Sequence, residues 1–180
     1  MLDEYGFEIF EENAFPIAYL LTFRTYGTWL HGDVRGSYQR RRDEPLASIT
    51  VDPNTPLHEK MAETSAHPPI VFSKNQRELI GEAITEVCRH RAYDLRAMNV
   101  RTNHVHAVIA KQVNPKKIVN DLKAYSTRRL RNEGEFTGSR KIWTRGSSTR
   151  YLWKPKHLVA AIEYVLYSQG DVPFGAFPDH

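Results

Sequence analysis

The spacing of hydrophobic positions along the chain predicts an alternation of strands and helices. Residues 18–24 form an apolar and aromatic run of the length expected for a buried strand. Ser73 is a good helix N-cap, and the apolar positions that follow it recur at helical spacing. Asn114 followed by Pro115 predicts the start of another helix. The expected elements, in order, are a strand at 18–24, a helix at 74–92, strands at 93–100 and 104–110, a helix at 115–132, short strands at 141–145 and 149–153, and a helix at 155–168.

This order is the split βαβ pattern of a ferredoxin-like α+β fold. We therefore expect an antiparallel sheet with the strand 104–110 in its interior, and one added C-terminal helix that carries Tyr164. The chain is expected to form a single domain over residues 1–180. The segment at about 26–72 shows no clear period, so we expect a long irregular insertion there, which in a compact domain is usually either functional or mobile.

Composition narrows the class of protein. Of the 180 residues, 41% are hydrophobic and 26% are charged, as in an ordinary folded domain. No apolar run approaches the roughly 18 residues that a membrane-spanning helix needs, and the acidic N-terminus lacks the basic region of a secretory signal. The single cysteine, Cys88, excludes an internal disulfide and is expected to be a core thiol in a reducing cytoplasm.

Charge is distributed unevenly around a net charge of +4. Residues 123–156 contain ten basic side chains and two acidic ones, so this segment carries +8 and the rest of the chain −4. Four aromatic residues interrupt the basic segment: Tyr125, Trp143, Tyr151 and Trp153. Cations of this kind can contact nucleic-acid phosphates while the rings stack on bases. A solvated cationic surface is the alternative interpretation.

The most distinctive local motif is His104-Val105-His106. Residues two apart on a strand point to the same face, so both imidazoles project side by side. Two neutral imidazoles in that arrangement can share one divalent ion and leave positions open for a substrate. The alternative is a pair of core histidines that only satisfy hydrogen bonds. The sequence contains no HExxH, paired CxxC, P-loop or GxSxG motif.

Two tyrosines near the basic segment differ in their helical position. Tyr125 follows Ile118 and Leu122 on the stripe that should face the sheet, which favours a structural or DNA-contacting role. Tyr164 lies off the apolar stripe of the last helix and has the small residues Ala160 and Ala161 on the preceding turn. A hydroxylated ring among small neighbours is accessible to a substrate.

Several segments, taken in order, resemble the single-tyrosine HUH transposases, which include insertion-sequence enzymes and the REP-associated branch. These segments are TNHVHAVIA, the later helix with STRRL, then IWTRGSSTRYLW and HLVAAIEYVLYSQG. The early stretch FRTYGTWLHGDVRG resembles the opening of the REP-associated branch. The resemblance extends from about residue 18 to residue 170.

The resemblance implies a DNA transposase that binds hairpin-bearing single-stranded DNA and forms a 5′-phosphotyrosine intermediate. It assigns the metal-binding pair to His104 and His106, the nucleophile to Tyr164, and the metal to Mg²⁺ or Mn²⁺. Some members of the family supply a third ligand, Gln or Asn, four residues after the tyrosine. That position is Ser168 here, and we favour the next residue, Gln169, because an amide oxygen is a better neutral ligand than a hydroxyl. A homodimer and a monomer are both compatible with the resemblance, and no membrane partner is expected.

The basic segment supplies the predicted DNA contacts. They are Lys123, Arg128, Arg129, Arg131 and Arg150 for the phosphates, with Tyr125 and Trp143 as aromatic contacts. Two other functions remain open at this point. One is a catalytically silent hairpin-binding protein derived from such a transposase, and the other is a metal-dependent phosphoesterase that activates water.

Overall fold

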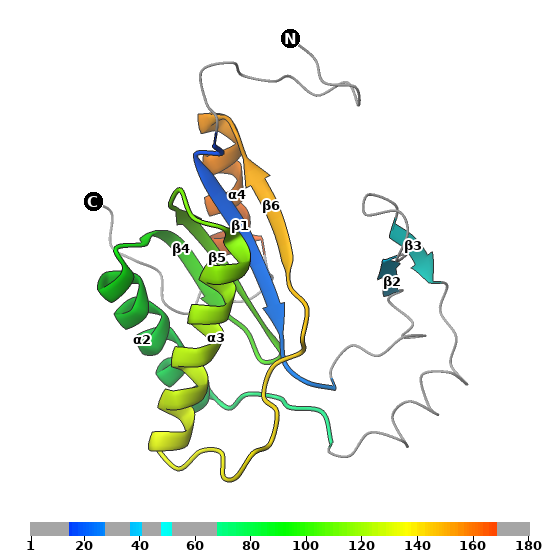
Figure 1. Cartoon of the computed structure of the whole chain (residues 1–180), viewed down its shortest axis with the longest axis vertical. Coiled ribbons are helices and arrows are strands. Elements are labelled where there is room, and N and C mark those ends of the chain that lie inside the picture. Colours follow the sequence, from blue (N-terminus) through cyan, green and yellow to red (C-terminus); the bar gives the residue numbers. More distant parts are fainter. Residues whose placement is uncertain (1–14, 28–36, 41–47, 52–67, 169–180) are drawn as a thin grey trace.

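The computed structural model describes residues 15–27, 37–40, 48–51 and 68–168. Four of the described strands form one antiparallel sheet in the order β4-β5-β1-β6, with β5 and β1 in its interior (Figure 1). The arrangement is α+β and ferredoxin-like, as the order of elements predicts. The strands are β1 (Ala18–Arg24), β4 (Asp94–Val100), β5 (His104–Ala110) and β6 (Ser148–Leu152), and the helices are α2 (Lys74–Arg91), α3 (Pro115–Asn132) and α4 (Pro155–Tyr167).

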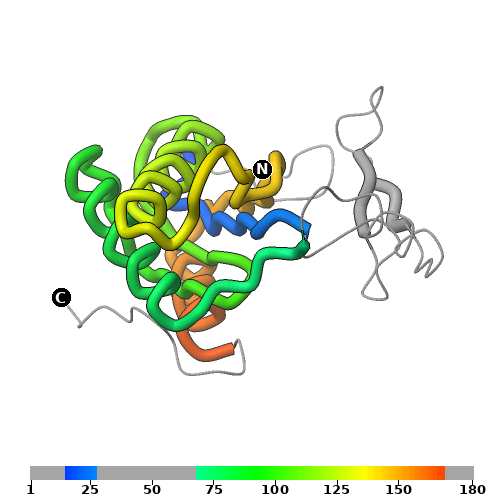
Figure 2. The backbone as a smooth tube through the Cα atoms, turned by 90° about the horizontal axis from the view of Figure 1, so that it is seen from below, coloured from blue at the N-terminus to red at the C-terminus, as the bar shows by residue number. Residues whose placement is uncertain are grey.

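Helices cover both faces of the sheet. Figure 2 shows α2 and α3 on one side of the strands and α4 on the other. The predicted helix starts are confirmed: Ser73 forms a capping box with Gln76, and the Asn114 side chain accepts a hydrogen bond from the Lys116 N–H, with Pro115 in the first turn. None of the helices in the described ranges is both long and apolar enough to cross a membrane.

Two expectations about strands need correction. Residues 141–145 form no strand; Trp143 makes a single isolated bridge with Thr25. Ser148 pairs with Thr22, so the pairing register changes by two residues between the bridge and β6. The additional residues interrupt the ladder, and β6 begins only at Ser148.

The segment at about 26–72, where we expected no regular element, contains two short strands. β2 (Ser37–Arg40) and β3 (Ser48–Val51) pair in an antiparallel, two-stranded sheet. Each strand has four residues, which is too short for a hydrophobic period to be recognised from the sequence.

The sheet divides two unequal cores. The face under α2 and α3 buries a large cluster that includes Phe23, Ile84, Ile109 and Leu122. Cys88 belongs to this cluster, and burial raises the pKa of its thiol to about 12, so it remains a neutral core thiol as predicted. The face under α4 buries a smaller cluster, formed by Ala18, Ala97, Val108, Leu152, Ala161 and Val165.

Candidate active site

The two histidines lie on the α4 face of β5. Val105, Ala107 and Ile109 of this strand belong to the large core, so the residues that alternate with them point toward α4. The ring centroids of His104 and His106 are 4.7 Å apart, with their planes nearly perpendicular. The His106 side chain is buried and that of His104 is partly exposed. The strand geometry expected for the HxH motif is therefore present.

Hydrogen bonds at Nδ1 orient both imidazoles. His104 Nδ1 lies 2.6 Å from the side-chain oxygen of Asn103, which can only accept a hydrogen bond, so the proton lies on Nδ1. His106 Nδ1 lies 2.8 Å from Oγ1 of Thr22, the residue paired with His106 on β1. A neutral imidazole that carries its proton on Nδ1 has its lone pair on Nε2. Metal-binding histidines commonly have this outer hydrogen bond.

Helix α4 brings Tyr164 next to His106. The two ring centroids are 5.7 Å apart, and 42% of the tyrosine side chain is exposed. Ala161 and Val165, on the same helix, are buried against the sheet. The phenol therefore lies at the boundary between the small core and solvent, beside an imidazole of the HxH pair.

A buried amide ties α4 to the same region of the sheet. The Asn99 side chain on β4 is 1% exposed, and its Nδ2 donates a hydrogen bond of 2.9 Å to the Val165 carbonyl. Asn99 is paired with His106 across the two strands. Asn99, His106 and Thr22 thus form a row across β4, β5 and β1, and this row fixes both an imidazole and the helix that carries Tyr164.

Two imidazoles are a suitable partial donor set for a divalent ion, because further positions remain for water or a phosphate oxygen. Within the described ranges, no group of three His, Cys, Asp or Glu side chains is placed to hold a metal. The predicted third ligand, Gln169, lies outside the described residues. Ser168, the other residue considered, follows the last residue of α4, and its N–H donates to the Tyr164 carbonyl.

The structure does not fit a stacking role for Trp143. This side chain is 6% exposed, its Nε1 donates to Thr127 Oγ1, and its ring packs edge-on against Phe23 and Phe72. A nucleobase cannot reach a ring in that position. The sequence reveals the aromatic residue within a basic segment, but not that it closes the large core.

Two of the predicted cationic contacts have partners within the protein. Lys123 Nζ donates to the carbonyl oxygens of Thr144 and Gly146, and burial lowers the pKa of this amine. Arg129 forms an ion pair of 2.6 Å with Glu86 on α2. These side chains hold the 144–146 segment and α2 against α3, so their charges are largely engaged.

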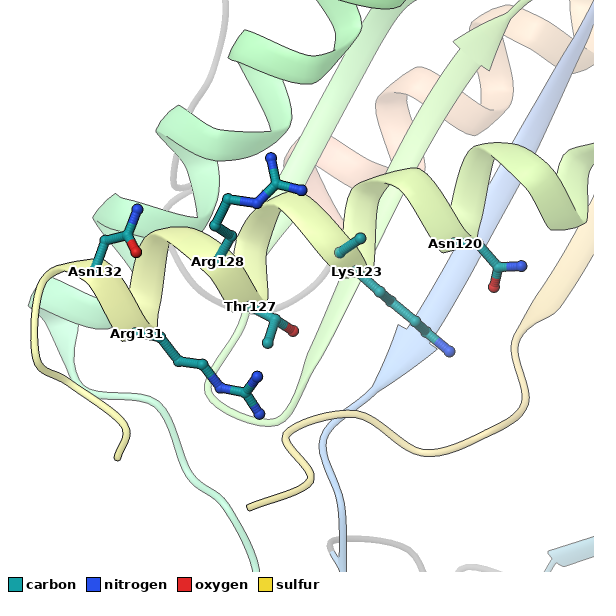
Figure 3. A pocket seen from close by; sticks show the side chains of 7 residues that line it. Asn120, Lys123, Thr127, Arg128, Arg131 and Asn132 are labelled. Carbon is teal, nitrogen blue, oxygen red and sulfur yellow. The ribbon is translucent and has the colours of Figure 1, made fainter. Parts of the chain in front are cut away.

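Two further predicted cations, Arg128 and Arg131, line a groove of about 570 Å³ on the outer side of α3 (Figure 3). The Arg128 guanidinium lies 5.1 Å from the centroid of the half-buried Tyr125 ring, while exposed Arg131 donates to the Arg140 carbonyl. Arg150 is exposed on β6. The lining residues are Asn120, Lys123, Ala124, Thr127, Arg128, Arg131 and Asn132. The groove lies on the opposite side of the sheet from the histidines.

Sequence reasoning missed Thr22 and Asn99. Each is a polar residue within a strand that was otherwise interpreted from its apolar positions. Their role depends on pairing register across β1, β5 and β4, which a single sequence does not provide. The signal that could have identified them is a polar residue within an otherwise apolar, buried strand.

A phenol and two imidazoles that meet on one face of a sheet have the composition of a metal-assisted, nucleophilic site. The sequence profile of the family described as "Transposase IS200 like" matches residues 69–168, a range that contains both histidines and Tyr164. The chain belongs to this IS200-like transposase family.

Two solved structures that match this chain have low sequence identity to it. A REP-associated tyrosine transposase bound to a REP hairpin is 12% identical with a TM-score of 0.48, covering 89% of this chain and 71% of that chain. A candidate transposase from Deinococcus radiodurans R1 is 14% identical with a TM-score of 0.45, covering 90% and 97%. No curated protein matches the chain. The family assignment rests on the sequence match.

Proposed function

We propose that this transposase cleaves and rejoins single-stranded, hairpin-bearing DNA through a covalent bond to Tyr164, with Mg²⁺ or Mn²⁺ held by His104 and His106. The observation that carries the proposal is the 5.7 Å separation between the Tyr164 and His106 rings. The sequence separation of these residues is large, so their proximity is a property of the fold. Family membership over residues 69–168 supports the same chemistry.

The reaction exchanges one phosphoester for another. The phenol of Tyr164 releases its proton to solvent as its oxygen attacks the scissile phosphorus. The bond from phosphorus to the 3′ oxygen breaks, and the 3′ oxygen takes up one proton from solvent and leaves as a hydroxyl. The product is a 5′-phosphotyrosine, from which the 3′-OH of another strand can displace Tyr164 and restore a phosphodiester. Bound Mg²⁺ or Mn²⁺ would supply positive charge at the non-bridging phosphate oxygens. Thr22 and Asn103 orient the imidazoles that would hold the ion, and Gln169 is our proposed third ligand.

The outer side of α3 supplies the proposed backbone contacts. Arg128 and Arg131 line its groove, and the lining includes no acidic residue. Arg150 is exposed on β6, on the face that α4 covers, and is proposed as a separate contact. Clustered cations attract a polyanion and release its counterions, which gives affinity without base recognition. Tyr125 contributes by supporting the Arg128 guanidinium.

One chain is sufficient for the proposed active site, because α4 brings Tyr164 to the imidazoles of its own sheet. A mixture of Tyr164→Phe and His106→Ala protein tests this point. We expect the mixture to form no covalent product, since neither chain holds a complete site. Restored activity would indicate that α4 completes the site of a second chain and that the protein acts as a dimer.

A labelled hairpin oligonucleotide with a single-stranded flank, incubated with Mn²⁺, tests the chemistry. We expect a protein–DNA adduct that survives denaturation, with the DNA attached to the tryptic peptide that contains Tyr164. Tyr164→Phe should abolish the adduct, whereas Tyr167→Phe, on the same helix and 73% exposed, should retain it. Clean hydrolysis without an adduct would instead indicate a phosphoesterase, and a mobility shift alone a silent binding protein.

A further inference from the structure

Two exposed aromatic rings lie in parallel at the end of the edge strand β6. Tyr151 is 50% exposed and Trp153, just beyond the end of the strand, is 38% exposed. Their ring planes differ by 16°, and their centroids are 6.5 Å apart. Both the exposure and the orientation distinguish this pair from Trp143, whose ring is enclosed by the large core.

The separation of the rings suits a flat ligand between them. Residues two apart on a strand are separated by about 6.6 Å along its axis, which agrees with the centroid distance of 6.5 Å. Stacked bases are about 3.4 Å apart, so a base between two rings requires about 6.8 Å. Buried Tyr19 packs edge-on against Tyr151 at 5.4 Å and restrains the first ring.

The charge around the pair favours a nucleic acid over another flat ligand. From residue 136 to residue 162 the sequence contains no Asp or Glu, and Lys154 and Lys156 follow the rings along the chain. Arg150, which is paired with Leu20, lies on the opposite face of β6. Tyr151 also lies on the same face of the sheet as α3 and its cationic groove, because its contact Tyr19 belongs to the large core. A polyanion in the groove can therefore continue along this face of β6.

The position of Tyr151 and Trp153 relative to the proposed active site follows from the pairing of the strands. Ser148 is paired with Thr22, which is in turn paired with His106, so the start of β6 is in line with the imidazoles across the sheet. Tyr151 and Trp153 are roughly 10 Å and 17 Å further along the chain direction. These two distances correspond to on the order of three and five stacked nucleotides, respectively.

We propose that Tyr151 and Trp153 form an aromatic clip that holds one base of the single-stranded flank of the DNA substrate. This inference rests on the proposed function. The clip stacks on a base at the β6 edge of the sheet, where the single-stranded DNA passes from the α3 groove toward the α4 face. Stacking of this kind tolerates different DNA sequences. Neither ring belongs to the proposed catalytic machinery.

Variants that remove or retain the ring test the clip. Trp153→Leu and Tyr151→Leu should each weaken binding of a flanked hairpin about tenfold, since stacking on one ring contributes that order of affinity. Trp153→Tyr and Tyr151→Phe should bind within about twofold of the unmodified protein. A hairpin without a flank should bind all five proteins equally. Thermal unfolding of each variant identifies any loss of folding, and Trp153→Leu is decisive if Tyr151→Leu is destabilised through Tyr19.

Photocrosslinking gives an independent result. A flank carrying 5-iododeoxyuridine at successive positions should crosslink at one position to the peptide that contains residues 151–153. If both folded Leu variants bound the flanked hairpin as tightly as the unmodified protein, the clip would be overturned, as it would be by equal losses in the Leu and ring-retaining variants. Those results leave the Tyr164 adduct intact. If the unmodified protein formed no adduct, but its binding of the DNA flank still depended on the two aromatic rings, only the proposed catalysis would be overturned.

Discussion

The two faces of the sheet use their side chains differently. Under α2 and α3, large apolar residues such as Phe23 and Leu122 fill the interior, and charged groups lie outside it. Under α4, the core consists of three alanines, two valines and Leu152, and the polar groups of Asn99 and His106 are buried beside it. The comparison indicates that one face supplies most of the folding stability, while the other retains polar groups in fixed positions for chemistry.

Core truncations on the two faces should separate stability from activity. Leu122→Ala, in the large core, should lower the free energy of unfolding by about 2–5 kcal/mol. Val165→Ala, in the small core, should lower it by roughly 1–2 kcal/mol, because fewer buried methylenes are lost. Urea denaturation measures both. Adduct formation by the folded protein should fall more in Val165→Ala, which adjoins Tyr164, and the reverse order would break the comparison.

Removing the tie between β4 and α4 should impair the reaction more than DNA binding. Asn99→Leu leaves the buried Val165 carbonyl without its donor, at a cost of about 1–3 kcal/mol of stability. Displacement of the reacting phenol by an ångström can slow the chemistry by about 100-fold. Single-turnover adduct formation and flanked-hairpin affinity provide the two measurements. Parallel losses in both would assign Asn99 to folding alone.

The hydroxyl that orients His106 should be detectable through metal dependence. Thr22→Val keeps the shape of the side chain but removes the 2.8 Å hydrogen bond to Nδ1, and should weaken Mn²⁺ affinity or activity by about 10–100-fold. Thr22→Ser retains the hydroxyl and should keep most of the Mn²⁺ affinity and activity of the unmodified protein. A Mn²⁺ titration of adduct formation compares the two variants. Identical titrations would exclude an orienting role for this hydroxyl.

Charge removal on α3 should have the smallest effect and should depend on salt. Arg128→Gln and Arg131→Gln, in the groove, should each reduce the slope of log affinity against log salt concentration by about 1. Arg129→Gln is the matched control, since this neighbouring guanidinium is paired with Glu86 and should leave the slope nearly unchanged. An equal change for all three would mean that the groove is not the DNA-binding surface.

Long periodic segments were predictable because local rules act over many residues. Helices α2 and α3 begin at the predicted caps, and β5 has the predicted bounds. Residues 141–145 were predicted wrongly because a strand also requires a partner in register, and here the pairing with the end of β1 is limited to one bridge. The four-residue strands β2 and β3 were missed because they are too short to show a period.

Some features of the candidate site were likewise predictable from the sequence, and others were not. The spacing of His104 and His106 determines that both imidazoles share a face, and the position of Tyr164 off its apolar stripe indicates an accessible phenol, because both follow from the repeat of one element. Tertiary structure alone decides that these groups meet, that Thr22 and Asn99 adjoin them, and that Trp143 is buried while Trp153 is exposed. These outcomes depend on strand register and on which elements cover each face, and neither is encoded in the periodicity of a single segment.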